Sequence, residues 1–189
     1  KYKDGKEIKY TIKEDVIANY KTDISGDAAS GFTVKNTNTE KITVPVEKKW
    51  VGKSTNKVEV KLLADGTEKG SADLTAADSW KHEFKNLPKY DSADGHEIVY
   101  TIKEVKISGY NTVISGTAKD GFTITNTIIG KVSVPVTKKW VGTPADSITV
   151  NLYANGNKVD SKKITKNDNW RYIFKDLEKY KDGKEIKYT

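Results

Sequence analysis

The sequence contains no cysteine and no methionine, and it has only two histidines among 189 residues. Without cysteine, the chain has no disulfide to stabilise a small fold and no thiolate for metal binding or nucleophilic chemistry. Because the first residue is lysine, we interpret the chain as an excised or processed segment. No apolar run approaches the length of a membrane span, and no signal peptide or sorting motif is present. We therefore expect any export signal or wall anchor outside this segment.

Charged residues are nearly as frequent as apolar ones, at 31% against 35%, which predicts small hydrophobic cores. The formal net charge of +7 comes mainly from lysines at the polar positions of every predicted strand, as expected for a solvated face. Such charge gives weak attraction to an anionic cell wall or to nucleic acid. No compact basic stripe with interleaved aromatic residues is present, so we predict no nucleic-acid partner.

The usual residues of metal and catalytic sites are scarce. His82 lies in a predicted strand and His96 beside a predicted loop, with no third ligand in sight, so we predict no metal and no cofactor. The segment Asp91–Gly95 resembles an acidic calcium loop, but it lacks the downstream bidentate glutamate, and a turn is predicted instead. No glycine-rich phosphate loop and no Ser/His/Asp pairing are present.

Short alternating segments separated by turn residues run through the whole chain, which predicts an all-β fold. Apolar and polar residues alternate in Val58–Leu62, just before the hairpin signal Ala64–Gly66. Helical periodicity is absent, apart from a short turn near Thr75–Asp78. Pro45 and Pro135 lack a backbone donor, which suits an edge or a bulge, so we expect the first part of each of their strands to be a sheet edge or the strand to switch sheets there.

An internal repeat organises the chain. Residues 41–130 form one complete unit, predicted to be one domain. In the terminal piece 131–189, residues 131–178 repeat the first half of this unit, and residues 1–40 repeat its second half; matching residue numbers differ by 90 in both cases. The terminal pieces are therefore predicted to be the two halves of a second domain, in reversed order. The ends also overlap, because Lys1–Thr11 is identical to Lys179–Thr189.

The strand Ile42–Trp50 recurs as Val132–Trp140, and each copy carries a lysine within an apolar row. Because side chains alternate along a strand, Lys48 shares its face with Val46 and Trp50. One interpretation is a lysine that snorkels to the rim of the core. The other is a buried lysine that needs a partner, because an unpaired buried charge is too costly.

Two other predicted strands offer such partners. In the predicted strand that ends at Glu104, Ile102 and Glu104 share one face. In the predicted strand that ends at Asn126, Ile124 and Asn126 share one face. Lysine, carboxyl and carboxamide groups in one hydrophobic core form the constellation of a spontaneous isopeptide bond. The alternative is a buried salt bridge between lysine and glutamate, with the asparagine as a hydrogen-bond partner.

A strand with Lys-x-Trp, a later Tyr-Thr-x-x-Glu and a closing Phe-Thr-x-x-Asn-Thr follow one another in this order. Together they resemble the collagen-adhesin B-type (Cna B-type) domain, a repeat module in the stalks of Gram-positive surface proteins. The resemblance covers essentially the whole chain. It implies tandem β-sandwiches with reversed immunoglobulin-like topology, and a Lys–Asn isopeptide crosslink promoted by the glutamate. The middle unit's set is then Lys48, Glu104 and Asn126.

This chemistry places separate demands on the lysine and on the glutamate. The lysine must be neutral to attack, and burial lowers the pKa of a lysine. The glutamate must carry a proton, so that it can polarise the asparagine carbonyl and then pass the proton to the leaving ammonia.

The resemblance assigns a second set to the split domain. Residues 131–189 contain Lys138, whereas residues 1–40 contain Asn36 and Glu14. Neither half is expected to be stable alone. Domain termini in this family lie at opposite ends, so we expect halves of different chains to pair head to tail, as open fibres or closed rings.

The resemblance implies a structural stalk repeat rather than an enzyme, with self-crosslinking as a single-turnover event. We expect it on the extracellular, cell-wall-anchored surface, beside neighbouring repeats or chains of the same protein, with any host matrix ligand bound by a domain outside this segment. Two alternatives remain open. One is a ligand-binding adhesin domain, although no exposed aromatic platform is apparent. The other is an engineered or permuted split domain that self-assembles head to tail; a natural array cut out of register would have the same sequence.

Overall fold

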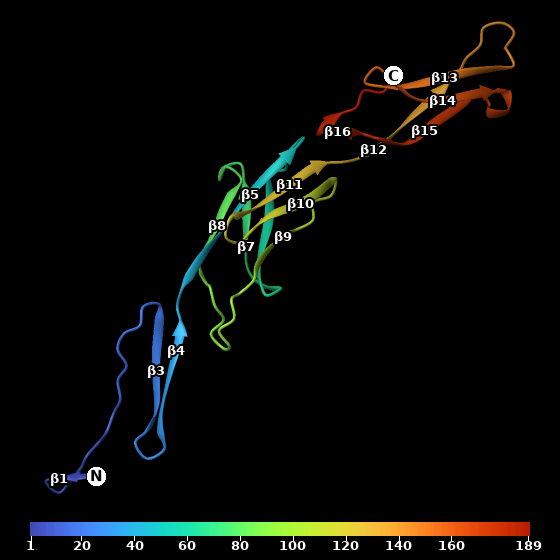
Figure 1. The fold of residues 1–189 in the computed structure, drawn as a ribbon. Coiled ribbons are helices and arrows are strands. Elements are labelled where there is room, and N and C mark those ends of the chain that lie inside the picture. Colours follow the sequence, from blue (N-terminus) through green and yellow to red (C-terminus); the bar gives the residue numbers. More distant parts are fainter.

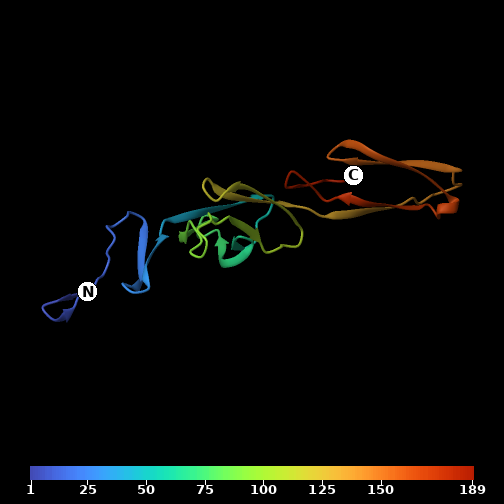
Figure 2. The same cartoon turned by 60° about the horizontal axis from the view of Figure 1, so that its bottom comes forward.

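The protein is an elongated rod of β-strands, described for residues 1–189 by a computed structural model. Figures 1 and 2 show the first residues at one end of the rod, followed by the hairpin of residues 20–38, here called the N-terminal hairpin. A two-sheet region lies in the middle and the C-terminal strands lie at the other end. No helix in the structure has the length and apolar character needed to cross a membrane. The all-β prediction is therefore confirmed.

Strands and one short 3₁₀ turn make up all of the regular structure. In chain order these are β1 (Tyr2–Lys3), β2 (Lys6–Glu7), β3 (Tyr20–Asp27), β4 (Gly31–Asn38), β5 (Lys41–Val51), β6 (Lys57–Ala64), β7 (Thr67–Thr75), β8 (Lys81–Pro88), β9 (Tyr100–Glu104), β10 (Tyr110–Thr117), β11 (Gly121–Ile128), β12 (Lys131–Thr137), β13 (Ser147–Ala154), β14 (Asn157–Thr165), η1 (Lys166–Asp168), β15 (Arg171–Glu178), β16 (Tyr180–Lys181) and β17 (Lys184–Glu185).

The middle of the chain is a β-sandwich. One sheet has the order β10-β11-β5-β8 and the other has the order β7-β6-β9. The core between them consists of alternate residues from both sheets, as the period of two requires. Its buried apolar members are Val44, Val46, Val58, Val60, Leu62, Ala64, Leu74, Phe84, Tyr100, Ile102, Phe122 and Ile124.

β5 is one of the two inner strands of the larger sheet, and it has two kinds of neighbour. It pairs antiparallel with β8 along its first part and parallel with β11 from Val46 onward. Pro45 therefore faces only β8, and the register with β8 shifts between Ile42 and Val44. The prediction of an edge is confirmed, because the missing donor of Pro45 falls where no second strand needs one. The alternative of a switch between sheets is wrong, because the whole of β5 belongs to one sheet.

The two ends of the chain form smaller sheets. β3 and β4 are a lone antiparallel hairpin, whereas β12 pairs with β15 and β13 pairs with β14. The last residues of the chain lie against β13, where Thr189 and Tyr153 exchange two backbone hydrogen bonds of 2.7 and 3.0 Å. The identical residues near the N-terminus make no such contact, and the Tyr10 side chain is exposed.

The junction between the middle sandwich and the C-terminal strands is a close backbone contact. A Cβ added to Gly183 would lie 2.7 Å from the carbonyl carbon of Val51 and closer still to the Gly52 nitrogen. Nearby, the Lys179 amide donates to the Gly130 carbonyl at 2.8 Å. The turn between β16 and β17 thus docks on the end of β5, and only glycine fits there.

We expect Gly183→Ala to open this junction, because its methyl group would collide with the backbone of β5. The measurement is hydrogen exchange at the Lys179 amide, which should become faster. Gly156→Ala is the matched control: both glycines have positive φ, +77° and +85°, in hairpin turns, but Gly156 has open space around its Cβ position. Equal effects of the two variants at Lys179 would contradict the docking role of Gly183.

Candidate functional site

Lys48 projects from β5 into the sandwich core. Its side chain is 0% exposed and that of Glu104 is 2% exposed, and Lys48 Nζ lies 3.1 Å from Glu104 Oε2. Glu104 is the last residue of β9, in the smaller sheet, so the pair spans the space between the two sheets. The interpretation of a lysine that snorkels to the rim is therefore wrong, because the valine neighbours of Lys48 on this face are themselves buried.

Asn126 joins the pair from the strand next to β5. In the parallel register of β5 and β11, Ile124 lies opposite Lys48 and Asn126 opposite Trp50. Asn126 and Lys48 are thus diagonal neighbours on one face of one sheet. Asn126 is fully buried and its Nδ2 donates to Glu104 Oε1 at 2.7 Å. The structure brings together the three residues predicted for the middle unit, here called the core triad: Lys48, Glu104 and Asn126.

The surroundings of Lys48 make its ammonium easier to deprotonate. Burial lowers the pKa of Lys48, and the nearby Glu104 carboxylate opposes that shift only in part. Lys48 Nζ also lies 4.4 Å from the Trp50 ring centroid. Three polar atoms of the triad, Lys48 Nζ, Glu104 Oε2 and Asn126 Oδ1, lack a well-directed hydrogen bond. A buried ion pair with incomplete hydrogen bonding is poorly compensated for its desolvation.

A fourth polar residue, Thr112, contacts the triad and was missed in the sequence. Its hydroxyl donates to Glu104 Oε1 at 3.1 Å, from a position on β10 directly opposite Asn126. The N-terminal hairpin has Thr22 at the equivalent position, opposite Asn36. A threonine repeated at the same offset as the triad residues was the signal that could have revealed it, but threonine is common in exposed strands.

The second predicted set is divided between the two ends of the rod. On the N-terminal hairpin, Asn36 Nδ2 donates to Glu14 Oε1 at 3.0 Å, so these two residues are together. Lys138 directly follows β12 (Lys131–Thr137), and β12 and the β3–β4 hairpin lie in different parts of the rod, with the middle sandwich between them (Figure 1). The Lys138 Nζ lies 4.5 Å from the Trp140 ring centroid, as Lys48 does over Trp50. The structure therefore does not bring Lys138 to Asn36 and Glu14 within one chain.

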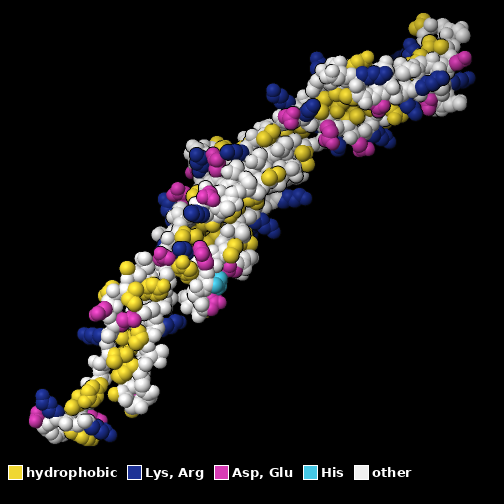
Figure 3. Space-filling view, viewed as in Figure 1, with side chains coloured by type: hydrophobic (Ala, Val, Ile, Leu, Met, Phe, Trp, Pro, Cys, Tyr) yellow, Lys and Arg dark blue, Asp and Glu magenta, His cyan; other side chains and the backbone are white.

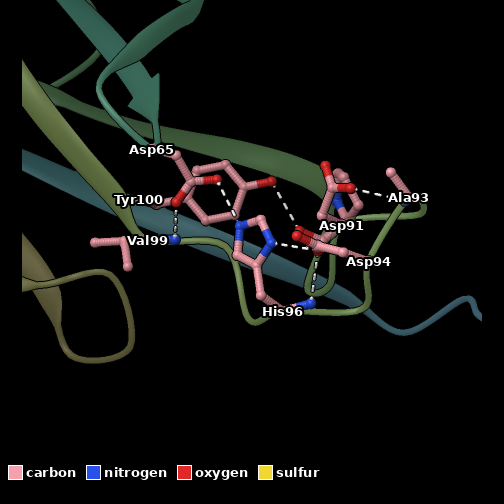
Figure 4. A network of polar contacts seen from close by, with 8 residues as sticks. Asp65, Asp91, Ala93, Asp94, His96, Val99 and Tyr100 are labelled. Atoms are coloured by element: carbon pink, nitrogen blue, oxygen red, sulfur yellow. Dashed lines mark hydrogen bonds and ion pairs between the residues drawn. The ribbon is translucent and has the colours of Figure 1, made fainter.

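His96 belongs to a separate surface cluster, shown in Figure 4. Its Nδ1 lies 2.5 Å from Asp94 Oδ1 and its Nε2 lies 3.1 Å from Asp65 Oδ2. One possible ligand atom each from Asp91, Asp94 and His96 lie within 4.8 Å of one another. Both ring nitrogens already face carboxylates, however, so the geometry favours a charge clamp between two loops over a metal site. The clamp raises the pKa of His96 to about 8, first through Asp94 and then through Asp65.

The fold and the core triad define a class of protein: a β-sandwich repeat module with a lysine, a glutamate and an asparagine in its core. The sequence profile of the Cna protein B-type domain matches residues 1–37, 44–127 and 134–189. The chain belongs to this family, and the resemblance noted in its sequence is confirmed.

Relatives agree with this assignment. The chain is 35% identical over 204 residues to a collagen adhesin of Staphylococcus aureus, in an alignment that covers 100% of the chain and 17% of the adhesin. The chain thus spans a small part of that relative's length.

Two solved structures from the collagen-binding surface protein of S. aureus are also similar. A single B repeat unit (B1) is 35% identical, with 79% of this chain and 84% of that chain covered and a TM-score of 0.43. Two B repeat units (B1B2) are 34% identical, with 100% and 53% covered and a TM-score of 0.45. Both TM-scores are low, so family membership rests on the sequence matches.

The His96 clamp predicts a pH-dependent stability. The folded-state pKa, about 8, is above the ordinary value of 6.5, so folding favours the protonated ring. This contribution is fully present below pH 6.5 and is lost as the pH rises through about 8. The difference in melting temperature between the natural chain and His96→Gln should therefore shrink across this window.

His82→Gln is the control for this experiment, because His82 packs on Phe84 and forms no ion pair with a carboxylate. A difference in melting temperature for His96→Gln that stays constant across the window would contradict the clamp.

Proposed function

We propose that the middle sandwich is a stalk repeat of a surface adhesin, locked by an isopeptide bond between Lys48 and Asn126 with Glu104 as the proton shuttle. The observation that carries the proposal is the core triad itself. One buried carboxylate contacts both prospective partners, Lys48 Nζ at 3.1 Å and Asn126 Nδ2 at 2.7 Å.

The reaction begins with proton transfer from the Lys48 ammonium to Glu104, which leaves two neutral groups in the core. The amine attacks Cγ of Asn126, forming the Nζ–Cγ bond, while the Glu104 carboxyl hydrogen-bonds the amide and polarises it. The Cγ–Nδ2 bond then breaks. The second proton of the amine passes through Glu104 to Nδ2, and ammonia leaves. Amine plus carboxamide become one secondary amide plus ammonia, with no oxidant and no change in total charge.

The surroundings of the triad support this chemistry. The fold excludes water from the site and holds the reacting groups on adjacent strands of one sheet, which removes the entropic cost of bringing them together. The product contains neither an ammonium nor an unpaired carboxylate, so the penalty of the buried ion pair disappears. Thr112 helps to hold the carboxylate in place through its bond to Oε1.

The rod shape supports a spacer role. The chain extends as parts joined end to end (Figures 1 and 2), as expected of a module that separates a head domain from a cell. On the face in Figure 3, basic and acidic side chains are interspersed along the rod, without one large patch of either sign. We therefore favour a spacer over a ligand-binding domain. An extracellular, wall-attached location and a host matrix ligand bound elsewhere in the protein are part of this proposal.

The crosslink is tested by intact mass under denaturing conditions. In a Lys138→Ala background, which removes the other candidate lysine, the chain should be lighter than its sequence by one ammonia. Adding Lys48→Ala should abolish this loss of ammonia. It should also lower the free energy of unfolding by about 4 kcal/mol, by analogy with a disulfide that closes a long loop. The control is Lys49→Ala, next in sequence but exposed. An unmodified mass in the Lys138→Ala background rules out the crosslink.

The role of Glu104 has its own test. Glu104→Gln keeps the shape of the side chain and one acceptor oxygen for Asn126 and Thr112 but cannot shuttle a proton, so the variant should fold and stay uncrosslinked. Thr112→Val should slow crosslinking without abolishing it, because it removes only a contact that positions the carboxylate. Intact mass measured over time after refolding gives the rate of crosslinking for the unaltered chain, Glu104→Gln and Thr112→Val. Complete crosslinking of Glu104→Gln would refute the role of the glutamate.

A further inference from the structure

The middle sandwich has four edge strands, and only β10 lacks charged residues. β8 and β10 are the outer strands of the larger sheet, and β7 and β9 are those of the smaller one. β7, β8 and β9 each carry an exposed lysine, at Lys69, Lys81 and Lys103. Exposed charges on an edge strand discourage pairing with another chain. β10 has the sequence Tyr-Asn-Thr-Val-Ile-Ser-Gly-Thr, with neither charge nor proline, so this edge is unprotected.

The internal repeat shows that the fold does not require a neutral strand here. β3 matches β10 at the offset of 90 and has the sequence Tyr-Lys-Thr-Asp-Ile-Ser-Gly-Asp. Lys21 takes the place of Asn111 and Asp23 that of Val113, and these two charged side chains form an ion pair of 2.9 Å. The N-terminal hairpin therefore has the protection that β10 lacks, on an otherwise similar strand.

The exposed side chains of β10 include two apolar ones. Val113 is 56% exposed and Ile114 is 39% exposed. Because side chains alternate along a strand, the two lie on opposite faces of the sheet. A strand added beside β10 would therefore cover apolar surface on both faces, which favours its binding.

The backbone of β10 also has free hydrogen-bonding groups. The Ile129 amide donates to the Gly109 carbonyl at 2.9 Å, and bonded pairs recur at every second residue of an antiparallel ladder. The odd-numbered residues of β10 are therefore the ones bonded to β11. The N–H and C=O groups of the even-numbered residues point to the open edge, where β10 has no second partner strand. These residues are Tyr110, Thr112, Ile114 and Gly116.

We propose that two copies of the chain associate through β10, which pairs antiparallel with β10 of the second copy and joins the two four-stranded sheets into one. The register follows from the open backbone groups. When Val113 lies opposite Val113 of the second copy, all four outward-facing residues of each strand find partners. Tyr110 then pairs with Gly116, and Thr112 pairs with Ile114. Any other register that keeps outward-facing residues opposite one another leaves some of them without a partner.

The side chains suit this register. The two Val113 residues at the two-fold axis form a non-hydrogen-bonded pair, in which side chains approach most closely. Tyr110 lies opposite Gly116, an arrangement in which an aromatic ring covers an edge glycine. No charged side chain lies within the paired strands, so the contact brings no like charges into direct opposition.

Charges just outside β10 favour the antiparallel direction. Lys106 precedes the strand and Asp120 follows it, and both are exposed. Antiparallel pairing brings Lys106 of each copy to the end of the strand where the second copy has Asp120. Lys119 is next to Asp120, however, and each chain has a formal net charge of +7. Salt screens the resulting repulsion between the copies, so association should become stronger as the salt concentration rises.

The geometry of the rod determines how the two copies lie. β5 and β11 run along the rod (Figures 1 and 2), and β10 is antiparallel to β11. The paired rods therefore lie side by side and point in opposite directions. Each copy uses the same surface, so the contact is isologous and ends at a dimer. In the proposed stalk role, rods with opposite directions would belong to two facing surfaces, but the pairing itself depends neither on that role nor on the core triad.

Single cysteines test the register, because the chain has none of its own. Directly opposed residues of a non-hydrogen-bonded pair have Cα atoms about 4.5 Å apart, which a disulfide can span. Val113→Cys with oxidised glutathione should therefore give a covalent dimer on a non-reducing gel. The matched control is Val159→Cys on β14, because Val159 is 55% exposed and belongs to the C-terminal part of the rod. It should stay mainly monomeric, and equal crosslinking of the two variants would overturn the inference.

A charge exchange at the same position tests the pairing without a covalent bond. Val113→Asp and Val113→Lys should each weaken association in sedimentation equilibrium by at least about tenfold, because the two-fold axis places like charges opposite each other. An equal mixture of the two variants should dimerise again, since each carboxylate then faces an ammonium. Val159→Asp should leave association unchanged. The fold accepts a carboxylate at this position, because Asp23 occupies the matching place on β3.

Three results of the sedimentation experiment would overturn the inference. One is a natural chain that stays monomeric at every protein and salt concentration. Another is a Val113→Asp variant that associates as strongly as the natural chain. The third is a monomeric chain that binds a synthetic peptide of residues 109–118, which would show that the edge accepts a strand but not a second copy. None of these results bears on the crosslink between Lys48 and Asn126, which intact mass tests separately.

Discussion

The position of one ammonium group in a hydrophobic core constrains the whole middle sandwich. The Glu104 carboxylate reaches Lys48, and the Asn126 carboxamide hydrogen-bonds that carboxylate; the two groups come from two other strands, one in each sheet. The core triad therefore exists only when both sheets have packed together in the correct register. Chemistry at such a site reports correct folding, because a misfolded chain would have no aligned partners for the lysine.

A small core explains why a covalent link would matter. Twelve buried apolar residues fill the sandwich, and the chain has no cysteine to add a disulfide. Most of the ion pairs along the rod are solvent-exposed, and each contributes little to stability. Small domains of this kind commonly depend on an additional stabilising link, such as a disulfide or a bound metal. The proposed amide between Lys48 and Asn126 would supply one without any redox chemistry.

The sequence predicted the faces of the strands better than their neighbours. Alternation placed Lys48, Glu104 and Asn126 on inward faces, and the structure agrees, because the period of two reports which side of a sheet a residue occupies. It does not report which strands pair, so the parallel contact of β5 with β11 came only from the structure.

The contacts that escaped prediction lie outside the apolar rows. Thr112 went unnoticed because a half-exposed threonine is ordinary in strands. The clamp between His96 and Asp65 joins residues 31 positions apart on two loops, where no periodicity exists to be read.

The pairing of β5 with β11 has a mechanical consequence. These are the first and last strands of the middle sandwich, and they lie side by side in parallel. A force applied to the two ends of the sandwich therefore pulls β5 and β11 past each other along their length. All the backbone hydrogen bonds between the two strands then bear the force together. An antiparallel hairpin pulled at its open end would instead lose its backbone hydrogen bonds one at a time. The topology thus resists tension by shear, and Lys48 and Asn126 both lie within the sheared ladder.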